Sequence, residues 1–364
     1  MHDTAIVIQD ALRMGPVDNA RHEARTTLDM RAQRAADRKV DLVLDRIEPQ
    51  LAHDLCFGAT CETRADYLIA AAEIDGDALP LRVVLTNRHQ MLFGPYRRTL
   101  DGTLERLPPA FGLGSQHKIP LVLVAARHRE WQLCNRHFED IRNTSGPVPV
   151  EACDHRRPAG WVATREALGR SMNLPWIDLA ARHFDDVMAL ETGLGFLGRP
   201  AGPGGAAMGV GRVAPPERFM ALLAAIERAG RGAAPRTEGL SLLEGAPQFA
   251  VDLDALGYPR ALAATAAALL SAPLKGPVGT LRLLSTQIRD TGCDVTIGKT
   301  GTGEVESGAA RARTATVAVA CGIRRYVVFV SVSSGHGGTP LGNVGARDLG
   351  QLIAAALHGL REAR

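Results

Sequence analysis

Three short polar motifs along the chain contain the residue types that proton transfer and nucleophilic chemistry require. Residues 115–118 read Ser-Gln-His-Lys, residues 171–173 read Ser-Met-Asn, and residues 299–302 read Lys-Thr-Gly-Thr. Each motif alone is common, but the three in this order, each in a suitable local pattern, indicate one site. A fold that uses them together has to bring three distant segments to one place.

The first motif predicts an activated serine. A serine hydroxyl is a weak nucleophile unless a neighbouring base removes its proton. Ser115 and Lys118 are three positions apart at the expected start of a helix, and this spacing places both on one face. A desolvated lysine near other cations can lose its proton near neutral pH. We therefore predict that Ser115 is the nucleophile and Lys118 its base. The alternative interpretation is that Ser115 is an ordinary helix cap and Lys118 a solvated lysine.

The second motif falls in a turn-like segment. Ser171 and Asn173 are two residues apart, just before Pro175, which disfavours a regular helix there. At such a turn Ser171 could relay protons to a leaving group, while Asn173 could orient Lys118 or hold a substrate amide. Read alone, the segment is also compatible with a simple turn.

The third motif lies at the end of a predicted strand. Gly301 leaves the strand edge without a side chain, so that an extended peptide can lie close against it. Thr300 and Thr302 offer hydroxyl groups and Lys299 a positive charge, and together they suit a substrate carboxylate. The alternative interpretation is that the motif only marks the start of a β-hairpin and has no binding role.

Longer segments around the motifs carry a family resemblance. Residues 25–36 read RTTLDMRAQRAA, residues 164–175 read TREALGRSMNLP, and residues 209–219 read GVGRVAPPERF. With the three motifs, they resemble the transpeptidase domain of class A penicillin-binding proteins, in the serine β-lactamase-like superfamily. The likeness runs from about Thr26 to the C-terminus.

The resemblance implies a role for each motif residue. Ser115 would be the acylated nucleophile and Lys118 its base, and the N–H groups of Ser115 and Thr302 would form the oxyanion hole. The implied catalytic residues are Ser115, Lys118, Ser171, Asn173 and Lys299, and the implied substrate-binding residues are Thr300, Gly301 and Thr302. No cofactor and no metal is implied.

The resemblance also implies an activity. The chain is expected to be a serine D,D-transpeptidase or D,D-carboxypeptidase that acts on D-Ala-D-Ala peptidoglycan stem peptides and is acylated by β-lactam antibiotics. A β-lactamase-type acyl hydrolase and a non-catalytic paralogue that binds peptidoglycan or β-lactams are the alternatives. The expected location is the bacterial periplasm or cell envelope, although the N-terminus does not read as a signal peptide.

The start of the chain departs from the family pattern. Only Met1–Arg25 precede the resemblance, so the sequence is expected to lack the membrane anchor and glycosyltransferase domain of class A proteins, and a separate glycosyltransferase is an expected partner. We predict a linker-like lead-in over residues 1–38 and one transpeptidase domain over residues 39–364.

Composition excludes several other classes. A net charge of +3 and 4% aromatic residues argue against a nucleic-acid partner. The longest mostly apolar run, Ala261–Leu274, contains Pro273 and is shorter than the roughly 20 residues of a membrane-spanning helix. We therefore expect no transmembrane segment.

The six cysteines leave their chemistry open. Cys134 and Cys153, with His137 and His155, form the only cluster that loosely resembles a zinc knuckle. A zinc site, a Cys134–Cys153 disulfide and unreactive thiols are all compatible with these spacings.

Hydrophobic periodicity predicts an α+β fold. In this fold helices flank an antiparallel β-sheet, and an all-α subdomain is inserted in the chain between the strands of the sheet. The resemblance implies that this is the penicillin-binding protein and β-lactamase-like transpeptidase fold. The predicted strands are Tyr67–Ala72, Leu81–Thr86, Asp294–Ile297, Thr314–Cys321 and Tyr326–Val332. The predicted helices are Asp29–Val43, Ser115–His128, Pro216–Gly230, Pro259–Leu274, Leu281–Ile288 and Ala346–Leu360.

Overall fold

The structure is a computed structural model. It describes residues 26–55, 66–74, 79–86, 96–98, 104–106, 114–135, 160–198, 200, 202–209, 212–213, 216–234, 238–241, 249–275, 279–304, 311–333 and 344–363.

Helices and strands alternate in blocks along these residues. The helices are α2 (Met30–Leu55), α3 (Lys118–Arg127), α5 (Thr164–Gly169), α6 (Leu174–Arg182), α7 (Phe184–Gly193), α8 (Gly202–Met208), α9 (Pro216–Gly230), α10 (Arg260–Leu270), α11 (Arg282–Arg289) and α12 (Ala346–Glu362), with the 3₁₀ turns η1 (Gly114–His117) and η4 (Ala272–Leu274). The strands are β1 (Asp66–Glu73), β2 (Leu79–Thr86), β3 (Tyr96–Arg98), β4 (Leu104–Arg106), β5 (Gln132–Cys134), β6 (Trp161–Ala163), β7 (Leu197–Gly198), β8 (Arg212–Val213), β9 (Glu238–Ser241), β10 (Phe249–Val251), β11 (Asp294–Glu304), β12 (Arg311–Cys321) and β13 (Arg324–Ser333).

One large sheet joins the two ends of the chain. Its strand order is β10-β9-β2-β1-β13-β12-β11. β1 pairs antiparallel with β13, so that Asp66 lies opposite Ser333. The hairpin of β1 with β2 and the meander of β11, β12 and β13 are antiparallel, as predicted. β9 joins β2 in parallel, so the prediction of a purely antiparallel sheet is wrong at this edge.

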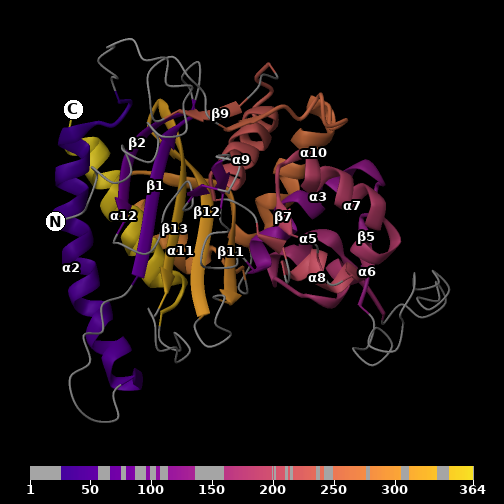
Figure 1. Cartoon of the computed structure of the whole chain (residues 1–364), viewed down its shortest axis with the longest axis horizontal. Coiled ribbons are helices and arrows are strands. Elements are labelled where there is room, and N and C mark those ends of the chain that lie inside the picture. Colours follow the sequence, from indigo (N-terminus) through magenta and orange to yellow (C-terminus); the bar gives the residue numbers. More distant parts are fainter. Residues whose placement is uncertain are drawn as a thin grey trace.

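The sheet separates two hydrophobic cores because side chains alternate along each strand. On β1, Leu68 and Ala70 face the core under α3 and α9, while Tyr67 and Ile69 face the core under α2, α11 and α12. Figure 1 shows α2 and α12 together on one side of the sheet and most of the helices that follow β2 on the other side. The architecture is therefore α+β, with helices on both faces.

The segment between β2 and β11 is mainly helical but not all-α as predicted. It also contains the short pairs β5–β6 and β7–β8 and the sheet strands β9 and β10. These strands have two to four residues each, which is too short for an alternating pattern to be visible in the sequence.

Most predicted elements are present with changed bounds. α9 matches its prediction, and α12 extends two residues beyond it. α2 continues to Leu55, well past the predicted end at Val43, and it crosses the predicted domain boundary at residue 38. The division into a lead-in and one domain remains a prediction. Among the described residues, no helix is both long and apolar enough to cross a membrane.

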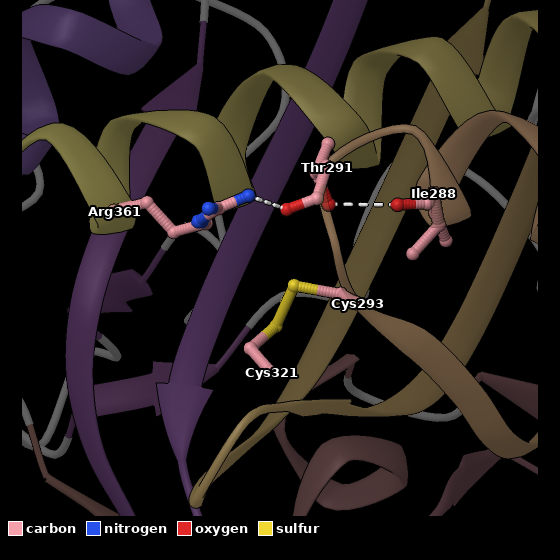
Figure 2. The surroundings of a disulfide bond; sticks show 5 residues. All are labelled: Ile288, Thr291, Cys293, Cys321 and Arg361. Carbon is pink, nitrogen blue, oxygen red and sulfur yellow. Dashed lines mark hydrogen bonds between the residues drawn. A yellow bond between two sulfur atoms is a disulfide. The ribbon is translucent and has the colours of Figure 1, made fainter.

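A disulfide closes one end of the meander. Cys293 precedes β11 and is bonded to Cys321 at the end of β12, where Asp294 lies opposite Ala320. Figure 2 shows the bond beside α12, from which Arg361 donates a hydrogen bond to the carbonyl oxygen of Thr291. The bond therefore fixes the register of β11 and β12 near the packed C-terminal helix.

Removing this disulfide should destabilise the chain. The two cysteines are 28 residues apart, and a loop of this size corresponds to roughly 3–4 kcal/mol in the chain-entropy description. We expect the C293S/C321S double variant to lose about that much free energy of unfolding in urea titrations. I323S, in the exposed β12–β13 turn, is the control and should stay within about 0.5 kcal/mol of the wild type. Equal stability of wild type and double variant would contradict the prediction.

Candidate functional site

The first motif lies where η1 runs into α3. Ser115 is in the 3₁₀ turn and Lys118 is the first residue of α3, so Ser115 precedes the α-helix and does not lie in its first turn as predicted. Residues three apart eclipse one another in a 3₁₀ turn, which keeps both side chains on one side. The pair therefore meets although the helix begins later.

A glycine allows η1 to approach the sheet. Gly114 has φ of +52°, and a Cβ atom at this position would lie 1.9 Å from the backbone oxygen of Thr302 in β11. Only a residue without a side chain fits both the left-handed backbone and this contact. The close approach places Ser115 next to the third motif.

The buried amine of Lys118 is the centre of the site. Its Nζ lies 3.1 Å from Ser115 Oγ, 2.8 Å from Asn173 Oδ1, and 3.0 Å and 3.3 Å from the carbonyl and hydroxyl oxygens of Ser171. The side chain is fully buried. One nitrogen thus connects the first two motifs.

The second motif forms the turn between α5 and α6. Ser171 has φ of +53°, which is unusual for a residue with a side chain and indicates a conformation held by its surroundings. As predicted, no regular helix runs through Ser171 and Asn173, because α5 ends at Gly169 and Pro175 lies in the first turn of α6, where its missing N–H is tolerated. The turn directs Ser171 and Asn173 at Lys118.

The third motif lies inside β11 and not at the end of a strand. Lys299 is fully buried, and its Nζ donates hydrogen bonds to Ser171 Oγ at 2.9 Å and to the carbonyl oxygen of Thr300 at 2.9 Å. Ser171 Oγ therefore lies between the amines of Lys118 and Lys299. The five predicted catalytic residues form one connected cluster.

Burial controls the charge of both lysines. Loss of solvation lowers the pKa of Lys118 from 10.5 to about 7. Burial also lowers the pKa of Lys299 well below 10.5, and the neighbouring charge of Lys118 lowers it further. Two amines so close together disfavour double protonation. At neutral pH the cluster therefore contains an amine that can accept a proton.

The predicted substrate-binding residues line the edge of the sheet. β11 is the last strand in the order, so among the residues that the structure describes it has a strand partner only on the β12 side. Thr300, Gly301 and Thr302 follow Lys299 along it, and Thr302 Oγ1 accepts a hydrogen bond of 2.6 Å from Arg313 on β12. A strand edge without a strand partner can pair with an extended chain.

Several supporting residues were not found from the sequence. Gln116 accepts a hydrogen bond from Thr316 of β12, which ties η1 to the sheet. His117 is fully buried, with Nδ1 3.6 Å from Glu191 Oε1, and its ring contacts those of Phe196 and Phe219 edge to face. The sequence marked Gln116 and His117 only by their position between Ser115 and Lys118. Their supporting roles could not be predicted because the residues that they contact are far away in the sequence.

Of the four residues in the possible zinc cluster, the structure describes only Cys134. It takes part in a disulfide, so it is neither a zinc ligand nor a free thiol, and its partner lies outside the described residues. Cys153, His137 and His155 also lie outside them.

Comparisons identify a similar fold but no sequence family. No protein-family model and no characterised protein sequence matches the chain. The crystal structure of a peptidoglycan glycosyltransferase from Burkholderia ambifaria is similar, with a TM-score of 0.56 and 14% sequence identity over 93% of this chain and 97% of that chain. At this identity the likeness shows a shared fold.

This finding corrects the family and activity predicted from the sequence. The similar structure is described as a glycosyltransferase, which contradicts the penicillin-binding transpeptidase resemblance and the D,D-transpeptidase or carboxypeptidase activity on D-Ala-D-Ala peptides. The acyl hydrolase and the non-catalytic binder do not fit it either. The physical reason is that three motifs of three or four residues specify a polar cluster, not the group that is transferred.

The approach of η1 to β11 predicts a sensitive glycine. G114A would place a methyl group against the backbone of Thr302 at a positive φ, and we expect a loss of about 2–4 kcal/mol in the free energy of unfolding. G204A is the matched control, because a Cβ there meets nothing within 4 Å. Urea titrations of both variants test this, and a G114A variant as stable as G204A would contradict the packing.

The lowered pKa of Lys118 predicts a pH-dependent stability. Between pH 7 and pH 10.5 the unfolded chain holds a proton on Lys118 that the folded chain has lost, so folding becomes more favourable as the pH rises. Relative to K118M, the wild type should gain roughly 1 kcal/mol for each pH unit in this range. Below pH 7 the difference should be constant.

Denaturant titrations at pH 6, 7.5 and 9 measure this difference. The exposed Lys39 on α2 provides the control, and K39M should stay within about 0.5 kcal/mol of the wild type. A K118M difference that does not change with pH would show that Lys118 titrates as an ordinary lysine.

Proposed function

We propose that this chain is an enzyme of the cell envelope that acts on a peptidoglycan-related substrate at the Ser115 cluster, with Lys118 as the general base. The observation that carries the proposal is the buried Lys118 amine, 3.1 Å from Ser115 Oγ, with a pKa of about 7. A base works best when its pKa is near the working pH. The fold shared with a peptidoglycan enzyme supports the substrate class.

Glycosyl transfer is compatible with a base in this position. An acceptor hydroxyl loses its proton as its oxygen bonds to the anomeric carbon and the leaving group departs. Neutral Lys118 can accept that proton, directly or through Ser115. Ser171 lies within hydrogen-bond distance of both lysines, so it offers a path by which the proton that Lys118 accepts can pass through Ser171 and Lys299 to the leaving group.

The remaining residues have positioning and binding roles in this proposal. Asn173, whose Oδ1 is 2.8 Å from Lys118 Nζ, orients the amine. The edge of β11 at Thr300 and Gly301 binds the extended peptide part of the substrate with main-chain hydrogen bonds, and Thr302, whose backbone oxygen lies against η1, contributes its hydroxyl group. Arg313 beside Thr302 supplies a positive charge for an acidic group of that peptide.

A polymerisation assay with a fluorescent lipid-linked disaccharide-pentapeptide tests the proposal. The wild type should lengthen the glycan, with a rate that rises with pH to a plateau and has an apparent pKa near 7. K118M should lose at least about 100-fold, as expected for removal of a general base. The control K39M, at an exposed lysine, should retain the wild-type rate.

Two outcomes would overturn the proposal. One is a folded wild-type protein that makes no glycan product, or a K118M variant that makes it as fast. The other is a covalent adduct on Ser115 in intact mass spectra after incubation with a peptide or a β-lactam, because it would show that the serine itself carries the transferred group.

A further inference from the structure

A second cluster of chemistry-bearing side chains lies at the other end of α3. His128 follows the last residue of α3, His183 connects α6 to α7, and Asp186 lies in the first turn of α7. Each offers a ligand atom, and these atoms all lie within 4.8 Å of one another. Since the ten residues of α3 span about 15 Å, this cluster is separate from Lys118.

The two histidine rings are already aligned. They stack with centroids 3.8 Å apart and planes 16° from parallel. His128 Nε2 is 2.6 Å from Asp186 Oδ2, and His183 Nε2 is 2.9 Å from Glu130 Oε1. The side chains of His128, His183 and Asp186 are 29%, 18% and 35% exposed, so the group is partly shielded but reachable from solvent.

The backbone holds this arrangement from both sides. Arg129 has φ of +55°, and its N–H bonds back to Ala126 while that of Glu130 bonds back to Ala125. This closes the end of α3 and places His128 and Glu130 on either side of the turn. The other side of the cluster is formed by the junction of α6 and α7. His183 lies at this junction, directly after α6 and directly before α7.

The charges around the cluster nearly balance. Three carboxylates and two guanidinium groups surround the histidines. Arg127 pairs with Asp186. Arg182 pairs with both Glu130 and Asp178. With both imidazoles neutral, these five groups sum to a single negative charge. A divalent ion changes the sum to a single positive charge.

We infer that His128, His183 and Asp186 bind a divalent transition-metal ion, and that Zn²⁺ is the ion their donor set suits. Two imidazole nitrogens and one carboxylate oxygen are typical zinc ligands and leave a fourth position for water. Metal-bound histidines usually donate their other nitrogen to a carboxylate, and Glu130 is placed to accept from His183. The ion would join the end of α3 to α6 and α7.

Binding of Zn²⁺ to the chelator-treated full chain tests the inference. Isothermal titration should give about one tight equivalent for the wild type, with a rise in the thermal midpoint. H128Q, H183Q and D186N should each weaken binding by at least about 10-fold. H358Q is the matched control, because His358 forms a histidine–carboxylate pair with Glu362 on α12 and should bind as the wild type does.

Spectra of the Co²⁺-loaded wild type provide a second readout that needs no variant. A nitrogen and oxygen ligand set gives weak visible bands without the strong near-ultraviolet absorption of a thiolate ligand. Absence of binding to folded wild type, unchanged affinity in H128Q and H183Q, or a thiolate spectrum would each overturn the inference. The first of these outcomes would leave the group as two ordinary histidine–carboxylate pairs, and none of them bears on the role proposed for Lys118.

Discussion

The removal of Lys118 from water is the constraint on which the rest of the site depends. An ammonium group without solvent is costly unless polar groups replace the water or the proton leaves. Here oxygen atoms from Ser115, Ser171 and Asn173 surround the amine, and they come from two separate segments. The turn between α5 and α6 and the 3₁₀ turn before α3 therefore have to meet at one nitrogen.

The sequence predicted local features well and long-range partners poorly. The spacing of Ser115 and Lys118 and the alternation along β12 and β13 are local, so the pair and the meander could be predicted. The Cys293–Cys321 bond depends on strand register, and the group around His128 and His183 depends on how helices far apart in sequence pack. Such contacts leave no periodic signal in one chain.

The chemical interpretation was limited for a related reason. A cluster of hydroxyl groups, an amide and two buried amines determines where protons can move, and this much follows from residue type and position. The bond that is broken depends on the shape of the bound substrate and on where its reactive carbon lies. Motifs of three or four residues contain no information about either, and one fold can support different reactions.

The pairing of β1 with β13 has a consequence for how the chain folds. Asp66 lies opposite Ser333, so the middle of the sheet joins residues from near the two ends of the described chain. Contacts this distant in sequence form slowly, because a long loop has to close first. During synthesis the apolar β1–β2 hairpin is made long before β13, its partner strand, exists. Until β13 has been made, the apolar hairpin lacks this neighbour, and exposed apolar surface of this kind favours aggregation.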